Sequence, residues 1–105
     1  MKACIYVRTS SDETNNPRDS IKTQETSCRA EAEKQSDEIV KVYVDIGKSG
    51  GSIKGRKDFI QMLEDAKKGL WHRIYILDLS RFSRRIIDQE TALEELMKLK
   101  VSVFS

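Results

Sequence analysis

Four short apolar runs alternate along this chain with longer segments in which the apolar residues have helical spacing. The runs occupy residues 3–7, 39–44, 74–77 and 101–104. The first is apolar at every position, which is typical of a strand buried on both faces of a parallel sheet, and the second is rich in β-branched residues. Strands that alternate with helices through short connections form right-handed crossovers. The pattern therefore predicts a three-layer α/β/α fold with a mainly parallel sheet.

Three helices are predicted between these strands. The first begins at a capping residue, Asp19 or Ser20, and runs to about Ser36. The second begins at Arg56 and ends at Gly69, a residue type that favours helix C-termini, and the third precedes the last strand. The residues expected to face the core are Ile21, Cys28 and Ala32 in the first helix, Phe59, Met62, Leu63 and Ala66 in the second, and Ala92, Leu93, Leu96, Met97 and Leu99 in the third.

The length and composition limit what such a domain can be. A chain of 105 residues is long enough for one small domain and too short for two. Its last predicted strand would leave an apolar, unpaired sheet edge, so we interpret residues 1–105 as a fragment of a longer protein. No run approaches the roughly 20 apolar residues of a membrane helix, and no signal peptide opens the chain. We expect a soluble, cytoplasmic protein without membrane contact.

Charge and cysteine content exclude some kinds of site. The net charge is only +2, so charge alone gives no argument for a nucleic-acid partner. Cys4 and Cys28 lie far apart without a CxxC motif or a histidine cluster, so we expect buried thiols and neither a disulfide nor a metal site. No cofactor is expected.

Polar loops follow the first three predicted strands, at residues 8–19, 45–54 and 78–85. Ligands of parallel α/β sheets bind beyond the carboxyl ends of the strands, so we expect these loops to border one crevice. The loops and the helix start after the second one hold cations and hydroxyls, namely Arg8, Ser10, Ser11, Arg56, Arg81, Arg84 and Arg85. A guanidinium group is a planar fork of donors that fits phosphate oxygens and keeps its charge. The pattern favours phosphoryl chemistry in which arginines, without a metal, neutralise the developing charge.

Taken singly, each of these residues has a simpler interpretation. Arg8 is then a solvated strand end, and Ser10 beside Ser11 is an ordinary turn. Arg84 and Arg85 are then the exposed side of a helix start. These interpretations lose weight because all the arginines are predicted at the same edge of one sheet.

Five motifs, in order along the chain, resemble those of the serine site-specific recombinases, the resolvase and invertase family. Residues 6–10 read Y-V-R-T-S and match Y-x-R-x-S, residues 20–24 match S-I-x-x-Q, and residues 43–50 match Y-x-D-x-G-x-S-G. Arg56 stands where the family has the arginine that opens its next helix, and residues 79–84 resemble L-D-R-L-S-R. Together the matches cover nearly the whole chain, and their order and spacing are specific.

This resemblance implies the strand order 2-1-3-4 and an enzyme that breaks and rejoins DNA strands. The implied partners are DNA and further copies of the protein, which in its full length assembles into dimers and tetramers. The long dimerisation helix and the C-terminal DNA-binding domain of the family are absent from residues 1–105. The fragment alone is therefore expected to be inactive in recombination.

The resemblance also implies a role for each matched residue. Ser10 is the nucleophile that attacks the scissile phosphodiester, forms a 5′-phosphoserine link and releases a 3′ hydroxyl. A serine hydroxyl normally needs an activating base, and here cationic activation by arginines takes that part. The other implied catalytic residues are Arg8, Arg81 and Arg84, and the supporting, phosphate-binding residues are Arg56, Gln24 and Asp45.

The chain departs from the family pattern at one motif. Where the pattern is K-L-D-R, residues 78–81 read D-L-S-R, a form similar to that of the large-recombinase and transposase branch. Asp78 either pairs with one of the arginines or is an inert strand end. Two alternative functions are a receiver-like signalling module with Asp78 as phosphoacceptor, and a non-catalytic assembly domain. The receiver is disfavoured because Arg8 and its neighbours stand where such a module needs acids to hold magnesium.

Overall fold

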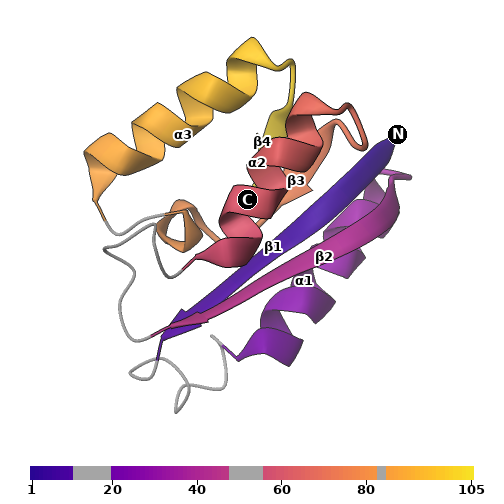
Figure 1. Ribbon diagram of the computed structural model, residues 1–105. Coiled ribbons are helices and arrows are strands. Elements are labelled where there is room, and N and C mark those ends of the chain that lie inside the picture. Colours follow the sequence, from indigo (N-terminus) through magenta and orange to yellow (C-terminus); the bar gives the residue numbers. More distant parts are fainter. Residues whose placement is uncertain (11–19, 48–55, 83–84) are drawn as a thin grey trace.

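The computed structural model describes residues 1–10, 20–47, 56–82 and 85–105, and these form one parallel sheet with helices on both sides (Figure 1). The predicted site residue Arg84 lies outside these ranges. Four strands pair in the order β2-β1-β3-β4, which confirms the predicted order and the central place of the first strand. The elements are β1 (Lys2–Ser10), α1 (Ile21–Lys34), β2 (Glu38–Gly47), α2 (Lys57–Lys67), β3 (Arg73–Tyr75), η3 (Leu79–Arg81, a 3-10 turn), α3 (Ile86–Lys98) and β4 (Ser102–Phe104).

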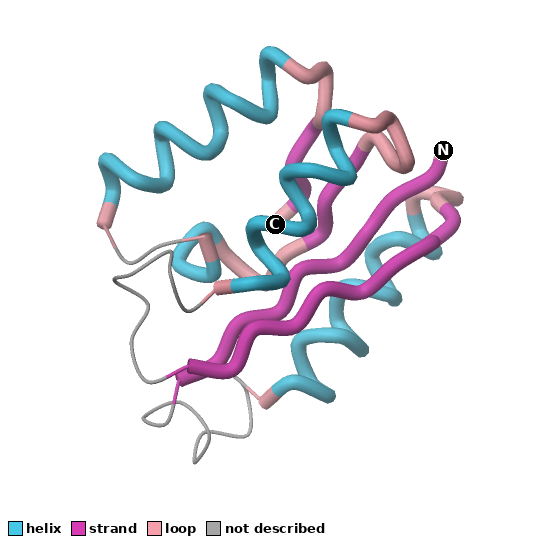
Figure 2. The backbone as a smooth tube through the Cα atoms, viewed as in Figure 1, coloured by secondary structure: helices cyan, strands magenta, loops and turns pink. Residues whose placement is uncertain are grey.

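The alternation of side chains along β1 divides the core into two layers. Ala3, Ile5 and Val7 pack against α1, whereas Cys4 and Tyr6 pack on the other face of the sheet, under α2 and α3. Both sets are fully buried, because a central parallel strand is covered on its two sides. Figure 2 shows that β1 and β2 extend well beyond β3 and β4. The carboxyl ends of these two long strands therefore form the edge where the predicted loops leave the sheet.

The helix ends follow from capping residues that the sequence contains. Ser20 caps α1, since its hydroxyl accepts a hydrogen bond from Thr23 N at 3.2 Å. Gly69, just after α2, has a φ of 72°, a left-handed conformation that glycine adopts without a Cβ clash. Cys4 and Cys28 are buried free thiols, as predicted. Burial raises the pKa of the Cys28 thiol to about 12, which keeps it protonated and unreactive.

Two details of the predicted elements are wrong. Met97 was expected in the core stripe of the last helix, but it is 73% exposed, while Leu96 beside it is buried. At about 100° per residue, Ala92, Leu93 and Leu99 lie within roughly 60° of Leu96 and pack against the same core, whereas Met97 lies outside this stripe. The third strand was expected over 74–77 but ends at Tyr75, because the chain turns from there into η3.

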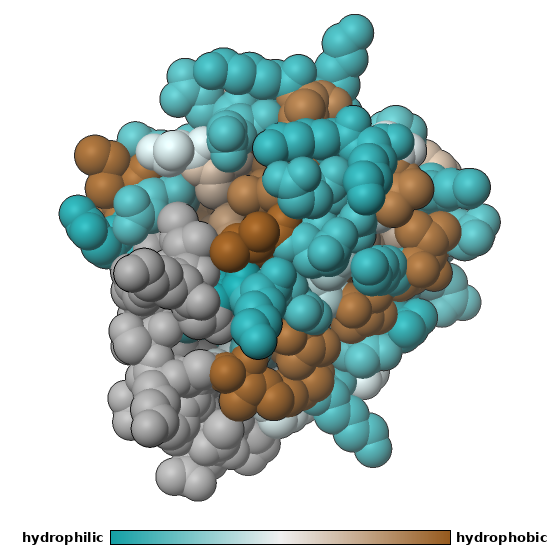
Figure 3. All heavy atoms as spheres, in the orientation of Figure 1, coloured by the Kyte–Doolittle hydropathy of each residue, from teal (hydrophilic) through white to brown (hydrophobic). Residues whose placement is uncertain are grey.

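Outside the grey residues, the face of the molecule in Figure 3 is mainly hydrophilic, and separate groups of apolar residues lie between the hydrophilic ones. Within the described ranges, no helix has both the length and the apolar composition that a membrane crossing requires.

Candidate active site

The predicted site residues that the structure describes gather near the carboxyl ends of β1 and β2. In the parallel register of these strands, Arg8 lies beside Asp45 and Ser10 lies beside Gly47. Ser10 is the last residue of β1, two positions after Arg8. The structure therefore places the main chain of Ser10 at the edge where parallel sheets bind ligands.

Arg8 and Arg81 bind each other's main chain across this edge. Arg8 Nε donates to the carbonyl oxygen of Arg81 at 3.0 Å, and Arg81 Nη1 donates to the carbonyl oxygen of Arg8 at 3.0 Å. Only 2% of Arg8 and 4% of Arg81 are exposed. A buried cation is costly unless polar groups surround it, and main-chain carbonyls supply that environment here.

Arg56 brings a third guanidinium into the same cluster. It donates to the carbonyl oxygens of Phe82 and of Arg81, the second at 2.8 Å, and to the hydroxyl of Tyr6 at 3.0 Å. Its guanidinium carbon also lies 4.2 Å from the centre of the Phe59 ring. The residue is the N-cap of α2, so the start of this helix carries the cation to the sheet edge.

Two guanidinium groups therefore donate hydrogen bonds to three successive main-chain carbonyls at η3. Arg8 Nη2 donates to the carbonyl of Ser80 at 2.7 Å, both arginines donate to that of Arg81, and Arg56 donates to that of Phe82. We call this set, the carbonyls of residues 80–82, the η3 carbonyl row. It connects β1, the start of α2 and the segment after β3, which is why the arginines from three distant segments meet.

The predicted supporting residues Asp45 and Gln24 hold the frame of this cluster. Asp45 accepts hydrogen bonds from the backbone N–H groups of Asp58 and Phe59, both at 3.0 Å, and so caps the first turn of α2. Gln24 is fully buried, and its Nε2 donates to the carbonyl of Arg8 at 3.2 Å. Both contacts suit residues that position the arginines.

Tyr6 connects Asp45 to the arginine cluster through Arg56. The sequence predicts this tyrosine only as a buried residue of the first strand. Its hydroxyl donates to Asp45 Oδ2 at 2.8 Å and accepts from Arg56. Burial raises the pKa of this phenol, so it stays a neutral donor. The signal that was available is a tyrosine in an otherwise apolar run, since a buried hydroxyl needs a partner.

Asp78 pairs with an arginine, the first of its two predicted alternatives. Its Oδ1 lies 3.5 Å from Arg81 Nε and accepts from the backbone N–H and the hydroxyl of Ser80. Arg85, by contrast, has a side chain that is 70% exposed and lies 3.7 Å from Asp88, so the interpretation as an exposed helix start holds for it.

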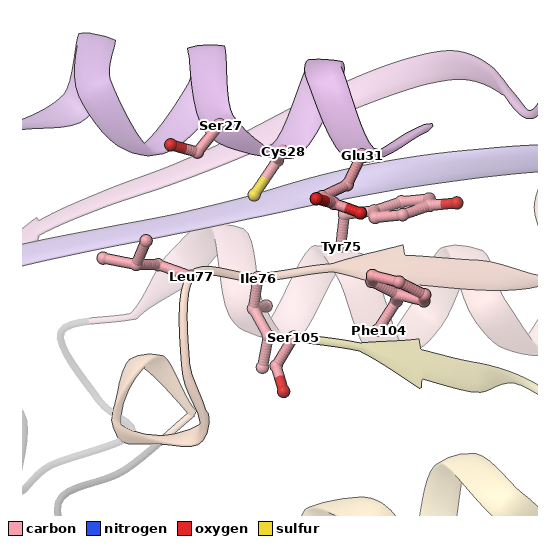
Figure 4. A pocket seen from close by; sticks show the side chains of 8 residues that line it. All are labelled: Ser27, Cys28, Glu31, Tyr75, Ile76, Leu77, Phe104 and Ser105. Carbon is pink, nitrogen blue, oxygen red and sulfur yellow. The ribbon is translucent and has the colours of Figure 1, made fainter. Parts of the chain in front are cut away.

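Other polar clusters and cavities lie away from these residues. Asp65, which is buried, accepts from Tyr43 at 2.5 Å and from Lys41 at 3.1 Å under the far end of α2. A cavity of about 200 Å³ lies between α1 and the β3–β4 side of the sheet, with Cys28 on one wall and Tyr75 and Phe104 on the other (Figure 4). In the part of the chain that the structure describes, no group of three or more His, Cys, Asp or Glu residues could hold a metal ion.

Comparison with known proteins identifies a family. The model of the family described as "Resolvase, N terminal domain" matches residues 3–105. A resolvase family site-specific recombinase from Streptococcus pneumoniae is 33% identical, with a TM-score of 0.81, over 99% of this chain and 70% of that one. No curated protein matches the sequence significantly.

Two more distant structures share the fold. The N-terminal catalytic domain of TP901-1 integrase is 24% identical, with a TM-score of 0.86, over 100% of this chain and 76% of that one. The C-terminal catalytic domain of ISC1926 TnpA, an IS607-like serine recombinase, is 22% identical, with a TM-score of 0.83, over 99% of this chain and 66% of that one. Each solved chain therefore extends beyond the part that this chain matches.

Proposed function

The chain belongs to the resolvase N-terminal domain family, the catalytic domain of serine recombinases, and on this premise we propose that it cuts and rejoins DNA through Ser10. The observation that carries the proposal is the convergence of Arg8, Arg56 and Arg81 at the edge where β1 ends in Ser10. Such a concentration of guanidiniums beside a hydroxyl-bearing strand end suits a phosphodiester, which carries one negative charge and gains more in the transition state.

In the proposed reaction the Ser10 hydroxyl oxygen attacks the scissile phosphorus. A bond forms between this oxygen and phosphorus while the bond from phosphorus to the 3′ oxygen of the DNA breaks. The serine loses its proton, and the leaving 3′ oxygen gains one to become a hydroxyl. The product is a 5′-phosphoserine link, and attack by a 3′ hydroxyl on this link reverses the step and rejoins the strands.

The arginines have the proposed role of binding the phosphate oxygens and lowering the cost of the charge that develops on them. Arg8, Arg81 and Arg84 contact the phosphate in this scheme, and Arg56, Gln24 and Asp45 support them. In the structure Arg8 donates to main-chain carbonyls with Nε and Nη2. When a phosphate binds, some of these hydrogen bonds must be replaced by hydrogen bonds to its oxygens. A guanidinium can donate two of these in parallel to one phosphate.

We further propose that this domain works within a longer polypeptide that dimerises and tetramerises on DNA. Recombination joins four DNA ends, so one nucleophile per subunit requires several subunits. The net charge of +2 gives this domain little nonspecific attraction for DNA of its own. Target recognition is accordingly assigned to a segment outside residues 1–105.

The test is the covalent adduct itself, measured in the full protein that contains this domain. DNA that carries its label on the scissile phosphate is incubated with the protein, and the products are separated on a denaturing gel. The unaltered protein and its Ser11→Ala variant are expected to retain label on the protein band, whereas Ser10→Ala retains none. Ser11→Ala is the matched control, because it removes the hydroxyl of the next residue in the sequence. Label trapped equally by Ser10→Ala would contradict the serine mechanism.

A further inference from the structure

The acidic residue that follows β3 holds the turn to which the arginines bind. Asp78 Oδ1 accepts from the backbone N–H of Ser80 at 3.1 Å and also from the hydroxyl of Ser80, so it caps η3. The next residues of the turn supply the η3 carbonyl row. Because Arg8 and Arg56 donate to that row, any shift of the turn moves both of their guanidiniums.

The same carboxylate also lies beside the third arginine. Asp78 Oδ1 is 3.5 Å from Arg81 Nε, and the Arg81 side chain is only 5% exposed, whereas that of Asp78 is 41% exposed. A cation that is largely removed from water interacts strongly with a nearby anion. Arg81 is thus held on one side by the charge of Asp78 and on another by the carbonyl of Arg8.

A departure from the motif pattern gains a physical meaning from this geometry. The pattern L-D-R puts an acid directly before the arginine, whereas this chain has Ser80 there. Here the Ser80 hydroxyl donates to the Asp78 carboxylate, and this carboxylate, two residues before Ser80, is the acid that lies beside Arg81.

We propose that Asp78 is a positioning residue for the proposed DNA cleavage, and that its negative charge orients Arg81 toward the scissile phosphate. This inference rests on the proposed function of Ser10 and deepens it. Asp78 acts through Arg81 and through the η3 carbonyl row, and it needs no contact with DNA. Asp78 therefore affects the rate of the chemical step and not the affinity for DNA.

The experiment separates the charge of Asp78 from its capping of the turn. Asp78→Asn and Asp78→Ser both keep a neutral oxygen that caps η3, whereas Asp78→Ala removes the cap as well. Glu64→Gln is the matched control, because Glu64 also forms a partly exposed ion pair with a residue three positions later, Lys67, on the outside of α2. Three quantities are measured in the full protein: the rate of adduct formation at saturating DNA, the Kd for DNA, and the melting temperature.

The expected result is that Asp78→Asn and Asp78→Ser form the adduct roughly ten- to a hundredfold more slowly, the size of loss that misplacement of a reacting group causes. Their Kd for DNA is expected to stay at the value of the unaltered protein, as are all three quantities for Glu64→Gln. Their melting temperature is expected to fall, because Arg81 loses a nearby anion, but no further than that of Asp78→Ala. Adduct formation by both neutral variants at the unaltered rate would overturn the proposal, whether or not Asp78→Ala is impaired, since Asp78 would then be at most a cap. A slower rate that returns to normal when the assay is run well below the lowered melting temperature would overturn it too. Failure of the serine mechanism is distinct, because it shows as an adduct in Ser10→Ala or none in the unaltered protein.

Discussion

The guanidinium group of Arg8 and that of Arg81 each donate to the other residue's main-chain carbonyl, at 3.0 Å in both directions. This reciprocal pair closes the carboxyl edge of β1 against η3. In the proposed function both residues also bind the phosphate, so a phosphate would compete with the main-chain carbonyls for the same guanidinium donors.

Removal of Arg81 is predicted to slow cleavage severely while Ser10 remains in place. By analogy with arginines that stabilise phosphoryl transfer elsewhere, Arg81→Ala should lower the rate of adduct formation about a thousandfold. Arg81→Lys should recover little of it, because one ammonium cannot reproduce the planar fork of donors. Single-turnover adduct formation measures both variants, and near-normal cleavage by Arg81→Lys would contradict the role of the fork.

Loss of the Tyr6 hydroxyl is predicted to damage both stability and cleavage. Tyr6→Phe leaves Asp45 without its 2.8 Å donor and removes an acceptor of Arg56, so unfolding should become easier by about 2 kcal/mol. Tyr75→Phe is the control, since Tyr75 donates to the carboxylate of Asp37 at the opposite end of the sheet. The free energy of unfolding, measured with denaturant, should be lower in both variants. Adduct formation should be slower only in Tyr6→Phe.

Thr9 is predicted to be replaceable with a gain in stability. Its hydroxyl is buried and has no hydrogen-bond partner in the described part of the protein, and it lies between Arg8 and Ser10 at a variable motif position. Thr9→Val keeps the shape and removes an unsatisfied polar group, which should stabilise the fold by about 1 kcal/mol. A lower melting temperature of Thr9→Val would show that the hydroxyl finds a partner in solution.

Acid is predicted to weaken the end of the sheet opposite the site through Asp37. A hydrogen bond from Tyr75, together with Arg73 and the N-terminal ammonium, holds the pKa of Asp37 below its ordinary value of 3.8. A depressed folded pKa gives stability that is present above the unfolded pKa and lost as the pH falls through the folded one. The free energy of unfolding, measured with denaturant, should therefore decrease below about pH 4. Asp37→Asn should be less stable at neutral pH and should lose this part of the decline.

The isolated domain of residues 1–105 is predicted to bind DNA weakly and without sequence preference. Its few phosphate contacts should weaken steeply as salt rises, because each one releases counterions. Titration of the domain against two unrelated duplexes at several salt concentrations measures this. A salt-resistant complex with one duplex would place target recognition inside this domain.

The linear order of residues was enough to predict the fold and the sheet edge at which the candidate site lies. Apolar runs alternating with helical stripes specify a parallel α/β sheet, because strand and helix periods are local properties of the chain. The end of each run then marks the sheet edge where Arg8, Ser10 and Asp45 lie, since parallel strands bring their carboxyl ends together. The resemblance to the recombinase family implied the strand order 2-1-3-4, which the structure has.

The partners of the arginines could be found only in three dimensions. Arg8 and Arg56 bind the η3 carbonyl row, and main-chain carbonyls belong to every residue, so no sequence pattern marks the ones that will accept. Arg8 and Arg81 lie 73 positions apart, and their contact depends on how β1 and the turn after β3 pack. The dual role of Tyr6 and the exposure of Met97 have the same origin, because burial and hydrogen bonding depend on neighbours that are distant in the chain.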